Sequence, residues 1–192
     1  MAYAARGMHA KALSLATEAS RQFPDEDVIK ILLARTSLND GKYQQCYKVL
    51  ENATILPFEG QRDVHELFVQ CQMCMGMEAM KKGRYPDAVR NLEGSKEYPE
   101  RLGTGKPGNP DYRAQDYLLA FTYDKMGYAA KAREARQRIA VFSPGRGGRT
   151  QTGQAGTASA VERWYGSTFQ SESELKALQE LLNLLRGGQR RR

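Results

Sequence analysis

Cys71 and Cys74 stand three residues apart in the run CQMC, a spacing used by redox pairs and by zinc sites. A zinc site needs two further ligands, and the chain offers only Cys46, His9 and His65 for that role. The pair also falls inside an expected helix, away from a helix N-terminus that would stabilise a thiolate. We therefore interpret these cysteines as core residues and expect no bound metal.

Two other runs resemble reactive motifs without completing them. The sequence GTGKPGN at 103–109 lacks the GxxxxGK[ST] spacing of a phosphate-binding loop and has Pro107 after its lysine. His65 and Glu66 are not followed by the second histidine that a metalloprotease helix requires. We assign no catalytic residue and expect no cofactor, and we predict that the chain is not an enzyme.

The elements that position these side chains are indicated by a pattern that recurs around four glycines. A small residue follows each glycine by five positions, and a proline follows by sixteen or seventeen. The glycine permits a tight turn between two antiparallel helices, and the small residue lets those helices cross closely. The proline ends the second helix. The glycines are Gly7, Gly41, Gly83 and Gly127, and the small residues are Ala12, Cys46, Ala88 and Ala132.

This pattern resembles the tetratricopeptide repeat (TPR), whose period of 34 residues separates Gly7 from Gly41. The resemblance covers residues 1–144 and lacks the family's early tryptophan. It implies an all-α, right-handed superhelical solenoid of helical hairpins, with a truncated first repeat and then three full repeats. The expected helices are 8–22, 27–40, 42–54, 62–82, 84–96, 111–126 and 128–141, with insertions near 58–62 and within 100–109.

The last part of the chain differs in composition. Residues 145–158 are rich in glycine and predict a flexible linker, and residues 187–192 form a basic tail. Between them, 159–186 predicts helices that cap the array. The run SESE at 171–174 resembles a capping box, and a leucine stripe follows it at helical spacing. The stripe consists of Leu175, Leu178, Leu181, Leu182 and Leu185.

The charge is concentrated outside the repeats. Residues 1–144 hold 21 basic and 18 acidic side chains, whereas the whole chain has a net charge of +7. Because the repeats are almost neutral, we do not expect a nucleic-acid partner. The Arg/Gly-rich pieces leave an RNA-binding scaffold as the third-ranked hypothesis.

In the TPR family the first helix of each repeat lines a concave groove, and the resemblance carries that role onto three expected helices. The apolar and aromatic positions among them would anchor a protein or peptide partner, flanked by basic side chains. For Met73, Met77 and Met80, packing between helices is an equally good interpretation. The expected function is therefore a protein–protein interaction scaffold. The groove residues are Arg35, Asn39, Gln70, Met73, Met77, Lys81, Tyr117, Phe121 and Lys125.

A second hypothesis comes from a looser resemblance. The segments 98–110 and 113–119 resemble a bacterial subgroup that carries its repeats at the C-terminus of large carbohydrate-related proteins. In that case the chain would be an accessory domain, and a β-rich domain upstream would distinguish the two hypotheses.

The sequence contains weaker indications of the cellular compartment and of membrane association. No apolar run approaches the roughly 20 residues of a membrane span, and no secretory signal opens the chain. The odd number of cysteines favours a reducing compartment, so we expect a cytoplasmic protein without a membrane partner. Only six residues precede Gly7, too few for the first helix of a repeat. The face left uncovered would recruit a second copy, giving a homo-oligomer, or the rest of a longer chain.

Overall fold

The computed structural model describes residues 7–56 and 62–142, and every regular element in these ranges is helical. The all-α prediction is confirmed for this part of the chain. The predicted linker at 145–158, the helices at 159–186, the basic tail at 187–192 and the residues before Gly7 lie outside the described residues. So does most of the predicted insertion near 58–62.

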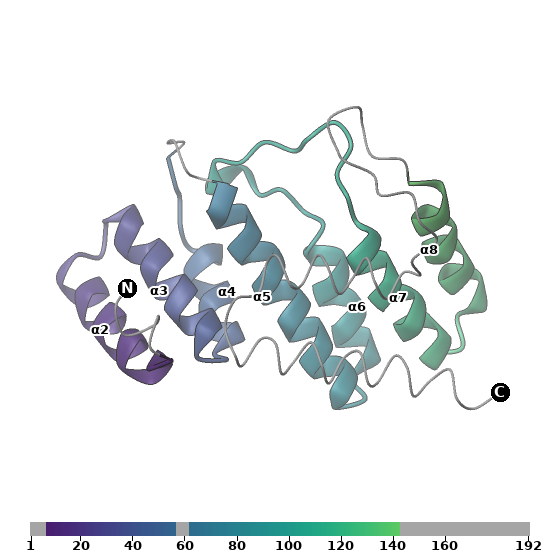
Figure 1. Ribbon diagram of the computed structural model, residues 1–192, viewed down its shortest axis with the longest axis horizontal. Helices are drawn as coiled ribbons and strands as arrows, with labels where there is room; N and C mark the ends of the chain where they lie inside the picture. The colour runs from purple at the N-terminus through teal and green to yellow at the C-terminus, as the bar shows by residue number, and fades with distance from the viewer. Residues whose placement is uncertain (1–6, 57–61, 143–192) are drawn as a thin grey trace. The chain divides into compact units, whose positions relative to one another are not determined.

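The helices begin and end close to their predicted bounds (Figure 1). The largest difference is at α4, which ends at Glu51 instead of 54. A short 3-10 helix, η1, was not predicted. The elements are α2 (His9–Gln22), α3 (Asp27–Asn39), α4 (Tyr43–Glu51), α5 (Arg62–Lys81), α6 (Tyr85–Gly94), η1 (Glu100–Leu102), α7 (Arg113–Lys125) and α8 (Ala129–Val141).

The turns at Gly41, Gly83 and Gly127 share one geometry, with φ of 74°, 70° and 76°. In each turn the residue after the glycine donates its N–H to the carbonyl five residues earlier, at 2.8–2.9 Å. The glycine itself donates to the carbonyl three residues earlier, at 3.0–3.1 Å. These paired bonds form the Schellman arrangement that ends a helix with a left-handed glycine. Gly7, before α2, has the same positive φ of 71°.

The next helix begins directly after each of these glycines. The residues that follow them are Met8, Lys42, Arg84 and Tyr128, with φ between −86° and −89° and ψ between 57° and 64°. The same backbone conformation therefore recurs after each of the four glycines that mark the sequence repeat. The small residues five positions after the last three glycines are completely buried.

The described residues divide into two compact units, and α5 contributes to both. The first unit holds α2, α3, α4, α5 as far as Met75, and the segment Glu97–Lys106. Its core includes Leu38, Leu50 and Phe68, and α3 packs against both α2 and α4.

The insertion between the third and fourth repeats is an ordered part of the first unit. η1 ends at Gly103, which has a φ of 67°, and Leu102 is fully buried. The carbonyl of Arg101 accepts the N–H of Ile55 at 2.7 Å, and its side chain donates to the carbonyl of Glu51 at 2.9 Å. This insertion therefore covers the end of α4.

The second unit holds the last turn and a half of α5, together with α6, α7 and α8. α7 packs against α6 on one side and pairs with α8 in an antiparallel hairpin (Figure 1). Gly76 lies so close to α6 that a Cβ at this position would be 2.9 Å from Cγ of Leu92. This contact gives a physical reason for a glycine inside a helix.

Candidate functional site

The predicted groove residues of the first unit lie on α3 and α5. Arg35 and Asn39 are one turn apart on α3, and each is half-buried. Gln70 and Met73 lie on α5, with exposed fractions of 7% and 0%. Met73 therefore packs in the interior and presents no surface to a ligand.

The groove residues of the second unit lie on α5 and α7. Tyr117, Phe121 and Lys125 are spaced four residues apart, so they share one face of α7. The two aromatic side chains are half-buried, whereas Lys125 is exposed and its Nζ lies 5.3 Å from the centre of the Phe121 ring. On α5, Met77 is 7% exposed and Lys81, one turn later, is exposed.

The buried side chains of α5 are distributed around the whole helix. From Leu67 to Met80 every residue except Met75 and Glu78 is buried. Such a run includes positions on every side of a helix with 3.6 residues per turn. The sequence pattern left Met73, Met77 and Met80 equally open to core packing and to groove surface, and the structure places all three in the interior. Several predicted groove residues also have interaction partners in the folded chain: Arg35, Asn39, Gln70, Met77 and Lys81.

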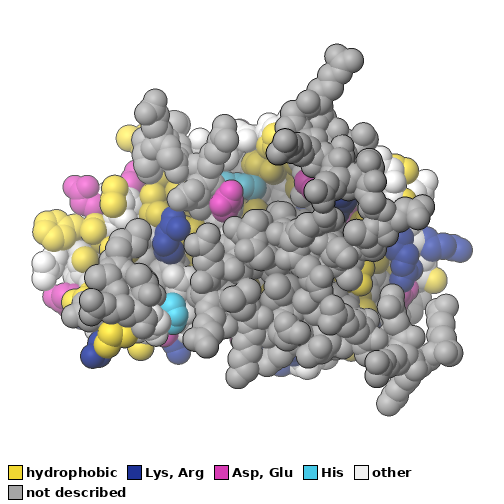
Figure 2. Space-filling model, in the orientation of Figure 1, with side chains coloured by type: hydrophobic (Ala, Val, Ile, Leu, Met, Phe, Trp, Pro, Cys, Tyr) yellow, Lys and Arg dark blue, Asp and Glu magenta, His cyan; other side chains and the backbone are white. Residues whose placement is uncertain are grey.

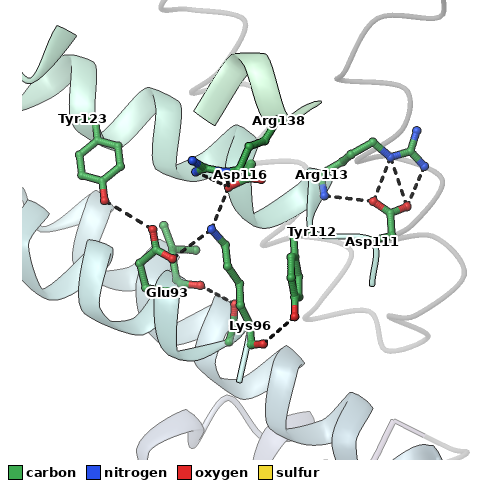
Figure 3. A network of polar contacts seen from close by, with 10 residues as sticks. Glu93, Lys96, Asp111, Tyr112, Arg113, Asp116, Tyr123 and Arg138 are labelled. Carbon is green, nitrogen blue, oxygen red and sulfur yellow. Dashed lines mark hydrogen bonds and ion pairs between the residues drawn. The ribbon is translucent and has the colours of Figure 1, made fainter. Parts of the chain in front are cut away.

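The second unit contains a charged cluster that was not predicted from the sequence (Figure 3). Its centre is Asp116 on α7, whose side chain is 5% exposed. This carboxylate accepts a hydrogen bond from Nζ of Lys96 at 2.8 Å and bonds from Nη2 and Nε of Arg138 at 2.7 and 3.1 Å. The paired carboxylate raises the pKa of the Arg138 guanidinium. Nearly all buried acids are paired in this way, because an isolated buried charge is costly.

The cluster continues to α6 and to the start of α7. Lys96 also pairs with Glu93 at 3.0 Å, and the carbonyl of Lys96 accepts the hydroxyl of Tyr112 at 2.9 Å (Figure 3). Because Asp116 directly precedes Tyr117, these bonds fix the rotation of α7 about its own axis. They therefore fix the direction in which the Tyr117, Phe121 and Lys125 face points.

The three cysteines are buried within the first unit, and none of them is in a disulfide. A hydrogen bond with Cys46 and burial hold the pKa of Cys71 well above its usual value. The thiolate is the reactive form, so this environment opposes nucleophilic or redox chemistry at Cys71. In the described part of the chain, no three His, Cys, Asp or Glu side chains are grouped so that they could hold a metal ion.

The contacts of His65 hold its ring against the first unit's own residues. Its ring stacks on Tyr98 with 3.9 Å between ring centres, and its Nε2 is 3.0 Å from the carbonyl of Glu97, which accepts the hydrogen bond. Burial lowers the pKa of His65, although the bond to Glu97 partly opposes that effect. The glycine-containing run at 103–109 follows η1 and not a strand, and residues 105–109 are exposed.

Two surface features lie outside the predicted groove. Large apolar side chains are exposed at the α2 and α3 end of the first unit, where Leu15, Phe23 and Val28 are 54–67% exposed (Figure 2). Lys and Arg side chains gather over α8 in the second unit (Figure 2), and Lys131 and Arg133 of that helix are exposed. The apolar end is the surface on which the sequence predicts self-association.

No model of a known protein family matches the sequence, and no match was found among curated proteins or among solved structures. Within residues 7–56 and 62–142, no helix combines the length and the apolar character that crossing a membrane requires.

Proposed function

We propose that this protein is a non-catalytic protein–protein interaction scaffold, built from TPR-type hairpins that stack in a right-handed superhelix. The repeated turn supports the TPR assignment, because the same glycine geometry and the same paired hydrogen bonds recur between successive helices. Stacked hairpins bury their core between neighbours and leave the first helix of each repeat for binding. Three buried cysteines outside any disulfide favour a reducing compartment such as the cytoplasm.

The observation that carries the proposal is the face of α7 formed by Tyr117, Phe121 and Lys125. Aromatic side chains are among the residues that most often dominate the affinity of a protein interface. Here they lie beside an exposed lysine that is held over the Phe121 ring. A partner segment with apolar anchors and carboxylates complements this arrangement.

The test has two stages, both with the full chain. Capture on the immobilised protein first identifies a partner, which is then titrated against the variants Tyr117→Ala and Phe121→Ala. Each should weaken binding by more than about tenfold, since loss of an aromatic anchor costs roughly 2 kcal/mol or more. Lys125→Ala should mainly change the salt dependence of binding.

Tyr128→Ala is the matched control, because Tyr128 is half exposed and stands in the turn between α7 and α8. Circular dichroism and thermal melting establish that each variant folds. If Tyr117→Ala and Phe121→Ala both fold and bind the partner as well as the parent does, the α7 face is not the binding site. The apolar end near Leu15 would then be the next surface to test.

A further inference from the structure

The turn between α2 and α3 carries large apolar side chains that the first unit leaves in solvent. Phe23 follows the last residue of α2 and Val28 is the second residue of α3, and they are 54% and 67% exposed. Leu56 lies beside them, because its N–H donates to the carboxylate of Asp27 at 3.3 Å, and it is 72% exposed. The side chains of Phe23, Val28 and Leu56 therefore form one accessible apolar surface, which we call the turn surface.

Carboxylates border the turn surface. Asp25, Glu26 and Asp27 are consecutive in the sequence and lie within the turn and the start of α3. Asp27 pairs with Lys30 at 3.2 Å, whereas Asp25 and Glu26 are exposed. Apolar side chains next to cations complement a surface of this composition.

The outer face of α8 in the second unit has these properties. Ala132 and Ala135 are completely buried, and α8 packs against α7. Arg133, Gln137 and Val141 follow one another at intervals of four residues, so they share the opposite side of the helix. All three are exposed, and Val141 is 71% exposed. This outer face therefore offers an apolar side chain and a guanidinium to solvent.

The charge of α8 is opposite to that of the turn surface. The helix carries four basic side chains and one acidic side chain. Arg136 and Arg138 pair with carboxylates of α7, whereas Arg133 is exposed on the outer face. The described residues of the first unit hold nine basic and ten acidic side chains, and those of the second unit hold eleven and seven. The near neutrality of the repeats therefore combines a slightly acidic unit with a basic one.

We propose that the turn surface of one copy of this protein binds the outer face of α8 in a second copy. The chain itself supplies both halves of this contact, because each surface exposes apolar side chains and the carboxylates of Asp25 and Glu26 are opposite in sign to Arg133. Since the two surfaces differ, the contact is heterologous and joins copies into a ring or an open chain. The contact uses neither Tyr117 nor Phe121, so it is independent of the proposed partner-binding face.

The experiment measures the weight-average mass of the full chain by sedimentation equilibrium at concentrations up to about 0.3 mM, where even a weak contact is populated. Asp25→Lys/Val28→Lys reverses a charge on the turn surface and removes an apolar side chain from it. Arg133→Glu/Val141→Glu makes the corresponding changes on the outer face of α8. Circular dichroism establishes that each variant folds.

The matched control is Ser14→Lys/Glu18→Lys, which makes the same change of net charge at two exposed positions of α2. The masses of the parent and of the control should rise above the 21.6 kDa of one chain, and added salt should reduce the rise. Each surface variant alone should associate at least about tenfold more weakly. An equimolar mixture of the two surface variants should regain association, because the intact surface of each fits the intact surface of the other.

A parent chain that stays at 21.6 kDa would overturn the proposal. Surface variants that associate as strongly as the parent would also overturn it, as would an equal loss of association in the control. If both surface variants lose association and their mixture does not regain it, the contact is not heterologous and the proposal is wrong. None of these results involves a captured partner, so they are separate from the test of the α7 face.

Discussion

The buried carboxylate of Asp116 allows a quantitative test of how the second unit is held together. In Asp116→Asn the side chain keeps its shape but loses the charge that pairs with Lys96 and Arg138. Removing one partner of a buried ion pair typically costs about 3–5 kcal/mol, because the remaining charge is left unpaired.

The cost here should lie below that range, because both cations keep an alternative. Lys96 retains its 3.0 Å contact with Glu93, and the Arg138 side chain is 47% exposed and remains partly hydrated. We therefore expect Asp116→Asn to lower the free energy of unfolding by roughly 2–3 kcal/mol. In a chain of this size that corresponds to a decrease in melting temperature of about 5–10 °C.

Chemical denaturation followed by circular dichroism measures this loss. Asp111→Asn is the matched control, since Asp111 forms an equally close pair with Arg113 but both side chains are 37–40% exposed (Figure 3). An exposed pair is worth about 0–1 kcal/mol. If the two substitutions cost the same, burial does not make the Asp116 cluster special, and its role in orienting α7 loses its energetic basis.

Three further experiments test the turns, the helix crossing and the histidine. Gly127→Val should lower the free energy of unfolding by about 1–2 kcal/mol or more, because φ is 76°. No atom lies within 4 Å of the position that a Cβ would take, so the cost comes from the backbone conformation. Gly127→Asn should lower the melting temperature less, because asparagine adopts a positive φ more readily. Gly76→Ala and Leu92→Ala should each destabilise the fold. The double variant should lose less stability than the sum of the two single losses, by at least about 0.5 kcal/mol, because removing the Leu92 side chain makes room for the new methyl group. Additive losses of stability in denaturant titrations would contradict the contact between Gly76 and Leu92. The folded state binds a proton on His65 more weakly than the unfolded state does, so this residue's stabilising contribution is complete above pH about 6.5 and declines as the pH falls below that value. The melting temperature of His65→Phe should therefore lie further below that of the parent at pH 8 than at pH 5, and parallel curves would refute that sign.

The hairpins were predictable from the sequence because their determinants are local. A glycine with positive φ, a small residue five positions later and a helix on either side all lie within one hairpin. The bounds of α3, α5 and α7 therefore agree with prediction to within two residues. The end of α4 was placed too late because the predicted helix took in Asn52–Thr54. Ala53 and Ile55 are instead buried in the irregular segment after α4, where the N–H of Ile55 donates to the carbonyl of Arg101 in η1.

The contacts that define the candidate site were not predictable, because they join residues that a repeat pattern treats as independent. Lys96 and Arg138 lie 20 and 22 residues from Asp116, and each resembles an ordinary surface charge in sequence. The stack of His65 on Tyr98 depends in the same way on the inserted segment returning to the first unit.

The burial of α5 shows a further reason why a family pattern cannot by itself locate a binding surface. The pattern states which side of a helix points inward, whereas exposure depends on everything else that packs there. Met77 occupies an inward position and is nevertheless 7% exposed, whereas Lys81 occupies the next inward position and is exposed. The apolar character that suits an inward methionine to a partner also suits it to packing inside the fold. An inward position is therefore a candidate for partner binding only where the fold leaves it accessible, as at Lys81 on α5 and at Phe121 on α7.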